Sequence, residues 1–158
     1  IGNLVGEKEL QKAKYASHIA ILICLVGAIV NTAIILSFRE ALVSLYSEDL
    51  AVIAIAINLL LFAAIFQIPD GMQMGALGSL RGYKDTFAPM LMLILTYWFI
   101  ALPAGYYLTY YGLFGDALGP AGIWIGMITG LTAFAGLIIP RLNYIANKFI
   151  TKSSSILP

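Results

Sequence analysis

The sequence is poor in charged residues and has almost no cysteine or histidine. Only 11% of its 158 residues are charged and 61% are hydrophobic, whereas soluble domains use roughly 25% charged and 45–50% apolar residues. This composition excludes an ordinary soluble enzyme. The single cysteine, Cys24, and the single histidine, His18, provide neither a disulfide pair nor a cluster of metal ligands. A formal net charge of +1 gives no basic field for nucleic acid.

The sequence also lacks the groupings of reactive residues that enzymes use. It contains no pair of acids at catalytic spacing and no glycine-rich phosphate loop after a strand. The serines and threonines within the apolar stretches have no evident base. We therefore predict that the protein is not an enzyme and that it uses no cofactor.

Long apolar runs dominate the sequence, whose mean hydropathy is +0.92. A bilayer core of about 30 Å is crossed by a helix of roughly 20 apolar residues, and four runs reach that length. None of them alternates with period two, as the strands of a membrane barrel would. The sequence predicts an all-α, polytopic bundle over residues 1–158, with a flexible polar tail at 151–158. The predicted spans are about 19–38, 50–80, 87–111 and 117–140.

The basic residues are distributed unevenly among the segments between these spans. Eight lie in the two ends and the second connection, and only Arg39 lies in the first connection. Basic residues favour the cytoplasmic side of a membrane, so we predict that both termini are cytoplasmic. The eight are Lys8, Lys12, Lys14, Arg81, Lys84, Arg141, Lys148 and Lys152.

Asp70 is the one acid embedded in apolar sequence, about five residues past the middle of the second span. An aspartate at such depth costs about 2.5–3.5 kcal/mol, and such residues usually face a bundle interior or a wet cavity. Pro69 and Gly71 on either side predict a bend in the helix. We expect Asp70 to hold a sodium ion or a proton. The alternative is an acid that only fixes helix packing.

Polar and aromatic residues near Asp70 are candidates for lining a cavity. Gln67 and Gln73, three residues to either side of Asp70, share its helix face. Phe66 lies one turn before the acid, Asn58 lies further out, and Tyr97 lies near the middle of the third span. For Tyr97, contact with lipid or with another helix is an equally good interpretation.

Glycines recur at helical spacing in two places. Gly122, Gly126 and Gly130 form one stripe, and a second runs from Gly71 through Gly75 to Gly78 and Gly82. Small residues on one face let another helix approach closely, so we predict that both stripes pack against helices. A surface along which helices slide is the alternative.

The stretch FQIPDGMQMGALGSLRGYKDT, residues 66–86, resembles the tenth helix and following loop of the multidrug and toxic compound extrusion (MATE) transporters, especially their NorM-like branch. The similarity extends to YWFIALPAGYYL at 97–108 and LGPAGIWIGMITGLTAFA at 118–135, which resemble the eleventh and twelfth helices. Residues 1–16 resemble the end of the eighth helix and the loop after it. The loop motif comprises Arg81, Gly82, Tyr83, Lys84, Asp85 and Thr86.

The resemblance implies a secondary transporter of the bacterial inner membrane with twelve helices in two lobes. Such proteins export cationic drugs and dyes in exchange for sodium ions or protons. This chain would supply helices nine to twelve, and the missing N-terminal helices and the lipid bilayer would be its partners. Asp70 matches the acid of the tenth helix that couples cations, and the acidic partner from the seventh helix lies outside this chain.

Two other functions are open at this point. One is a lipid-linked sugar flippase of the same superfamily, although such proteins tend to carry basic residues in a central cavity and these spans show none. The other is a four-helix membrane scaffold subunit without transport activity, in which Asp70 is structural.

Overall fold

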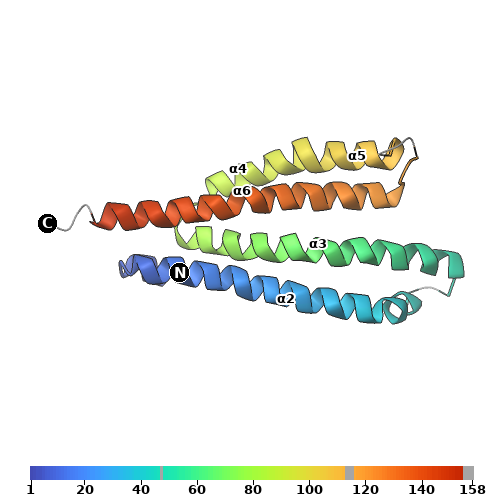
Figure 1. Cartoon of the computed structure of the whole chain (residues 1–158), viewed down its shortest axis with the longest axis horizontal. Coiled ribbons are helices and arrows are strands. Elements are labelled where there is room, and N and C mark those ends of the chain that lie inside the picture. The colour runs from blue at the N-terminus through green and yellow to red at the C-terminus, as the bar shows by residue number, and fades with distance from the viewer. Residues whose placement is uncertain (47, 113–115, 155–158) are drawn as a thin grey trace.

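The computed structural model describes residues 1–46, 48–112 and 116–154 (Figure 1). Every regular element in these ranges is helical, which confirms the predicted all-α class. The elements, in chain order, are α1 (Gly2–Gly6), α2 (Leu10–Ser44), α3 (Leu50–Gly82), α4 (Phe87–Thr96), the π-helical turn η1 (Tyr97–Ala101), α5 (Leu102–Tyr110) and α6 (Pro120–Ser154).

Four helical stretches among the described residues are long and apolar enough to cross a membrane, and each overlaps one of the four predicted spans, although the first extends beyond residues 19–38 at both ends. Large apolar side chains on these stretches are exposed, as expected where lipid replaces water; Phe99, for example, is 73% exposed. The prediction of a polytopic membrane bundle is therefore confirmed. The four stretches are Leu10–Ser44, Leu50–Gly82, Phe87–Tyr110 and Pro120–Ser153.

The last helix is longer than predicted. The predicted fourth span ends at residue 140, whereas α6 continues through Pro140 to Ser154. Its extension is stabilised by tertiary packing, because Leu142 and Ala146 are buried in the main core cluster. Residues 151–154, predicted as part of a flexible tail, are therefore helical, and 155–158 lie outside the described residues.

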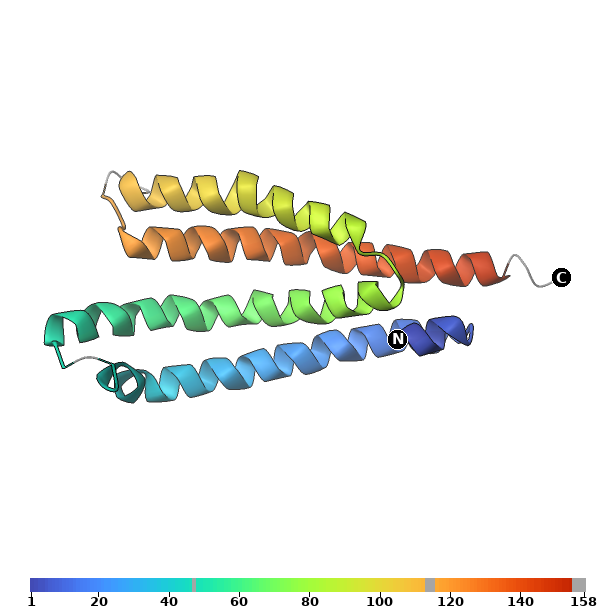
Figure 2. The ribbon, with the colours of Figure 1, turned by 180° about the vertical axis from the view of Figure 1, so that it is seen from behind.

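The long helices lie side by side in the order α2, α3, α6 and then α4–η1–α5 (Figures 1 and 2). The N-terminus and the end of α6 are at the same end of this bundle. We call it the basic end, because it carries the eight basic residues named above. The fully buried side chains of Leu80, Phe134 and Ile138 join α3 to α6 in the core.

The stripe Gly122, Gly126 and Gly130 brings α6 into backbone contact with η1 and α5. A Cβ atom added to Gly126 would lie 2.3 Å from the backbone nitrogen of Gly105, and one added to Gly130 would lie 2.4 Å from Cβ of Ala101. Real Cβ atoms do not approach other atoms so closely. The prediction that this stripe packs against a helix is confirmed.

The second stripe holds α3 against α2. A Cβ atom at Gly71 would lie 2.6 Å from Cβ of Ala28, and one at Gly75 would lie 2.6 Å from Cα of Ile21. Gly78 has no such neighbour within 4 Å, so it is not part of this contact.

The third span contains a wide π turn that the sequence analysis did not predict. The amide of Leu102 donates to the carbonyl of Tyr97, five residues back. Pro103, which follows, has no amide hydrogen, and in a regular α-helix its ring would clash with the carbonyl of Phe99. The wider turn lies directly before this proline.

Candidate functional site

The Asp70 carboxylate lies within α3, and a glutamine of the same helix holds one of its oxygens. Nε2 of Gln73 donates to Oδ1 of Asp70 at 2.8 Å, across the three-residue spacing that places two side chains on one helix face. No basic side chain lies within 4 Å of Asp70 in the described ranges. Its hydrogen-bond donor comes from its own helix, so this bond does not attach Asp70 to another helix.

Gln73 itself leaves an unused acceptor in the interior. The residue is only 7% exposed, and Oε1 has no hydrogen-bond partner among the described residues. A buried polar atom without a partner costs about 1–3 kcal/mol. Asp70 and Gln73 together therefore present oxygen acceptors and a negative charge, which is the chemistry that attracts a cation.

The other predicted lining residues do not all gather around Asp70. Tyr97 on η1 lies within reach of its electrostatic field and also lines a hollow of about 360 Å³ between α5 and α6. The Phe66 ring packs edge-on against Trp124 of α6, with 6.1 Å between ring centroids. Gln67 is half-buried on α3. Asn58 is exposed, and it donates to the carbonyl of Ala54 on its own helix at 3.1 Å.

Pro69 and Gly71 lie inside one continuous helix, since α3 is not interrupted at Pro69. Gly71 contacts α2, as described above, and Pro69 faces α6. Pro69 has no amide hydrogen to give to the carbonyl of Ile65. The predicted bend at these residues stays a prediction.

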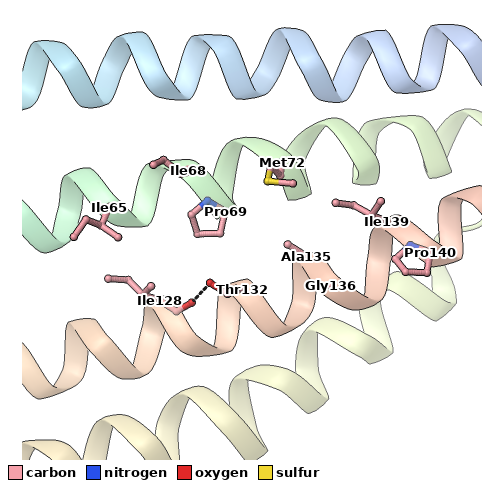
Figure 3. Close-up of a pocket in the computed structure, with 10 residues that line it drawn as sticks. All are labelled: Ile65, Ile68, Pro69, Met72, Ile128, Thr132, Ala135, Gly136, Ile139 and Pro140. Carbon is pink, nitrogen blue, oxygen red and sulfur yellow. Dashed lines mark hydrogen bonds between the residues drawn. The ribbon is translucent and has the colours of Figure 1, made fainter.

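An apolar groove of about 610 Å³ between α3 and α6 passes beside the site (Figure 3). Pro69 lines one wall, and Pro140 and Thr132 lie on the other (Figure 3). The Thr132 hydroxyl donates to the carbonyl of Ile128 at 2.7 Å and is therefore occupied within its own helix. This groove was not predicted from the sequence, although a proline in each of its two helices was a visible signal.

The loop motif from Arg81 to Thr86 attaches the end of α3 to α6. Nε of Arg141 donates to Oδ2 of Asp85 at 2.8 Å, in a pair that is largely shielded from solvent. Lys84 has a φ of 61°, which turns the chain out of the helix. Arg81 is exposed, and Thr86 precedes α4 without a side-chain capping bond.

Two residues of the motif have packing roles. The Tyr83 ring is 2% exposed and packs against Phe149, with 5.6 Å between centroids. Its hydroxyl has no hydrogen-bond partner within the described ranges. Gly82 lets the N-terminus approach, because a Cβ there would lie 2.7 Å from Cγ2 of Ile1.

Two side-chain bridges join α2 to α6 at the basic end. Nζ of Lys14 donates to Oδ1 of Asn147 at 2.8 Å, and Nε2 of His18 lies 2.9 Å from Oδ1 of Asn143. The partner of His18 was not predicted from the sequence. The equal spacing of four residues in both pairs was the available signal.

Fold and site together define a polytopic membrane protein with an aspartate inside its second span. Comparison with known sequences assigns the chain to a family. The MatE family profile matches residues 1–107, and the chain belongs to this family, the MATE transporters. The resemblance noted in the sequence is thereby confirmed.

Curated relatives cover nearly the whole chain. Multidrug resistance protein PmpM of Pseudomonas aeruginosa is 39% identical over 150 residues, which are 95% of this chain and 31% of the relative. Multidrug resistance protein NorM of Vibrio vulnificus is 38% identical over 92% of this chain and 32% of its own length. Multidrug resistance protein MdtK of Photorhabdus laumondii is 35% identical over 91% and 32%. The chain thus spans about a third of the length of these relatives.

Proposed function

We propose that this chain forms helices nine to twelve of a secondary transporter that exports organic cations across the bacterial plasma membrane. The driving force would be the inward flow of sodium ions or protons. Family membership supports this proposal, as do relatives that are each named multidrug resistance proteins. Since the chain spans about a third of those relatives, the remaining helices would come from the same transporter.

The observation that carries the proposal is the Asp70 carboxylate in the middle of α3, without a basic partner among the described residues. Such a charge attracts an organic cation into a low-dielectric site, where attraction is stronger than in water. Entry of a sodium ion or a proton neutralises the carboxylate and lowers its affinity for the drug. Exchange then follows, because the two cations compete for one charge.

Gln73 and Tyr97 are assigned supporting roles in this mechanism. Gln73 holds Oδ1 of Asp70, so the other carboxylate oxygen faces the incoming cation. Tyr97, within the electrostatic reach of Asp70, offers an aromatic face of the kind that binds organic cations. Gln67 and Phe66 border the site on α3, and a bend at Pro69 and Gly71 would open and close it.

Both termini would face the cytoplasm. The charge distribution supports this orientation, because eight of the nine basic residues lie at the basic end.

An efflux assay tests the proposal. Cells producing the complete gene product that carries this chain are loaded with a fluorescent organic cation, and Asp70→Asn is compared with Asp116→Asn. The control makes the same chemical change at an exposed acid outside the helices. We expect Asp70→Asn to abolish gradient-driven efflux and Asp116→Asn to retain it. Unchanged efflux in Asp70→Asn would make Asp70 structural and refute the proposal.

A further inference from the structure

A hollow of about 360 Å³ lies between the third span and α6. Its lining residues come from η1, α5 and α6, so it is a space between helices and not a depression in one of them. Gly105 forms part of its surface and is in backbone contact with Gly126 of α6. Because glycine has no side chain, this contact leaves space between the larger residues around it.

Three tyrosines line this hollow, and none of the described residues that line it is charged. The rings of Tyr106 and Tyr110, one turn apart on α5, have centroids 4.9 Å apart and planes inclined at 47°. Tyr97 of η1 adds a third ring, and Met127 of α6 adds a polarisable thioether. We call this space the aromatic hollow. The face of an aromatic ring is partly negative, so such a surface attracts the positive charge of an organic cation.

The aromatic hollow adjoins the surroundings of Asp70. Tyr97, which lines the hollow, is within reach of the electrostatic field of Asp70. On α6, Trp124 packs against Phe66 of α3, with 6.1 Å between ring centroids. Ile123, the residue before Trp124, lines the hollow. A cation in the hollow is therefore attracted by the carboxylate as well as by the rings, and this attraction is stronger where water is excluded.

A second pair of tyrosines on the same helix does not line the hollow. Tyr107 and Tyr111 stack with 5.5 Å between ring centroids, and neither is a lining residue. The two pairs are similarly exposed, with 61% for Tyr106 and 57% for Tyr107. Tyrosines that only anchor a helix at the membrane interface act through their depth, so the two pairs would then be equivalent. Binding in the hollow would depend on one pair alone.

We propose that the aromatic hollow binds the planar aromatic part of an organic cation, with its rings against Tyr106 and Tyr110 and its positive charge toward Asp70. The inference rests on the proposed function, because the ligand is the cation that the transporter would export. Ligand pockets measure about 300–1,000 Å³, and the hollow lies near the lower limit. It therefore accommodates one planar ring system rather than a bulky drug.

Equilibrium binding of ethidium to the purified, complete gene product tests this site, since ethidium is planar, permanently charged and fluorescent. Tyr106→Leu with Tyr110→Leu should raise the Kd about tenfold or more, because two ring contacts are lost. Tyr107→Leu with Tyr111→Leu is the matched control and should leave the Kd unchanged. Tyr106→Phe with Tyr110→Phe keeps both rings and should bind as the wild type does.

Tyr97→Leu removes the third ring from a different element and should also raise the Kd. It provides a second test if thermal unfolding in detergent shows that the first leucine pair does not fold. Equal affinity in both leucine pairs, or an equal loss in both, would overturn the proposal for the hollow. A wild type that binds no organic cation would refute the proposed function as well. Binding that depends on Asp70 but not on Tyr106 and Tyr110 would refute the hollow alone.

Discussion

At the scale of the residue, Asp70 and Gln73 form the pair on which the proposed cation binding depends. The carboxylate is costly at this depth, and Gln73 stabilises one of its oxygens while leaving its own Oε1 without a partner among the described residues. An arrangement built only for stability would gain from replacing both residues with apolar ones. Under the proposed function, the pair would serve to bind a cation.

Gln73→Leu should separate binding from stability. It removes the bond to Asp70 but also removes the unpaired carbonyl, so we expect the free energy of unfolding to change by no more than about 1 kcal/mol. The loss of a hydrogen bond to a charged group should raise KM for the exported cation about tenfold. Gln11→Leu, the same chemical change at an exposed position near the start of α2, is the control. An equal effect of both substitutions on KM would contradict the role given to Gln73.

At the scale of the element, the helices are positioned by glycine contacts and by a few polar bridges. The glycine stripes and the spans are visible in the sequence, because helical spacing and apolar length are local properties. The π turn at Tyr97–Ala101 and the bridges from Lys14 and His18 to α6 are not visible in the sequence. They depend on how Pro103 is accommodated and on which helices become neighbours, and neither follows from one segment alone.

Gly126→Ala tests the contact between α6 and α5. The added Cβ atom would lie 2.3 Å from the backbone nitrogen of Gly105. We therefore expect overpacking to lower the free energy of unfolding by about 1–3 kcal/mol. Gly136 has nothing within 4 Å. Gly136→Ala should therefore be neutral or stabilising by about 0.5–1 kcal/mol, as alanine is the better helix former. Unfolding of the purified protein measures both, and equal destabilisation would refute the packing role of the stripe.

The ion pair of Asp85 and Arg141 is suited to a double-mutant cycle. Asp85→Asn, Arg141→Gln and the double variant should show a coupling of about 1 kcal/mol or more in the free energy of unfolding, because the bond is charge-assisted and shielded from solvent. Additive effects of the two substitutions would mean that the loop motif does not attach α3 to α6 through this pair.

At the scale of the whole molecule, the fold class and the family could be predicted from sequence, since apolar runs and the motif RGYKDT are continuous in the chain. The surroundings of Asp70 could be predicted only in part. Gln73 lies on the same helix face as Asp70 and was predicted from the sequence. Asn58 lies far from Asp70, because twelve residues of helix separate these two residues by about 18 Å. The electrostatic influence of Asp70 on Tyr97 depends on tertiary structure, because the two residues lie on different helical elements.

The orientation of the molecule can be checked by thiol labelling in a Cys24→Ala background. Single cysteines at Lys8 and Lys152 should react with a membrane-impermeant reagent only after the cells are opened. A cysteine at Glu48 should react in intact cells. This residue lies in the connection between the first two spans, which is expected outside when both termini are cytoplasmic. The reverse pattern would invert the proposed direction of transport.

The central claim is that an organic cation and the coupling ion compete for Asp70. Equilibrium binding of a fluorescent organic cation to the purified, complete gene product tests it most directly, with sodium ions and protons varied separately. We predict that one of the two ions displaces the dye from the wild type competitively, and that Asp70→Asn binds the dye weakly and without dependence on that ion. Undiminished, ion-sensitive binding in Asp70→Asn would contradict the account.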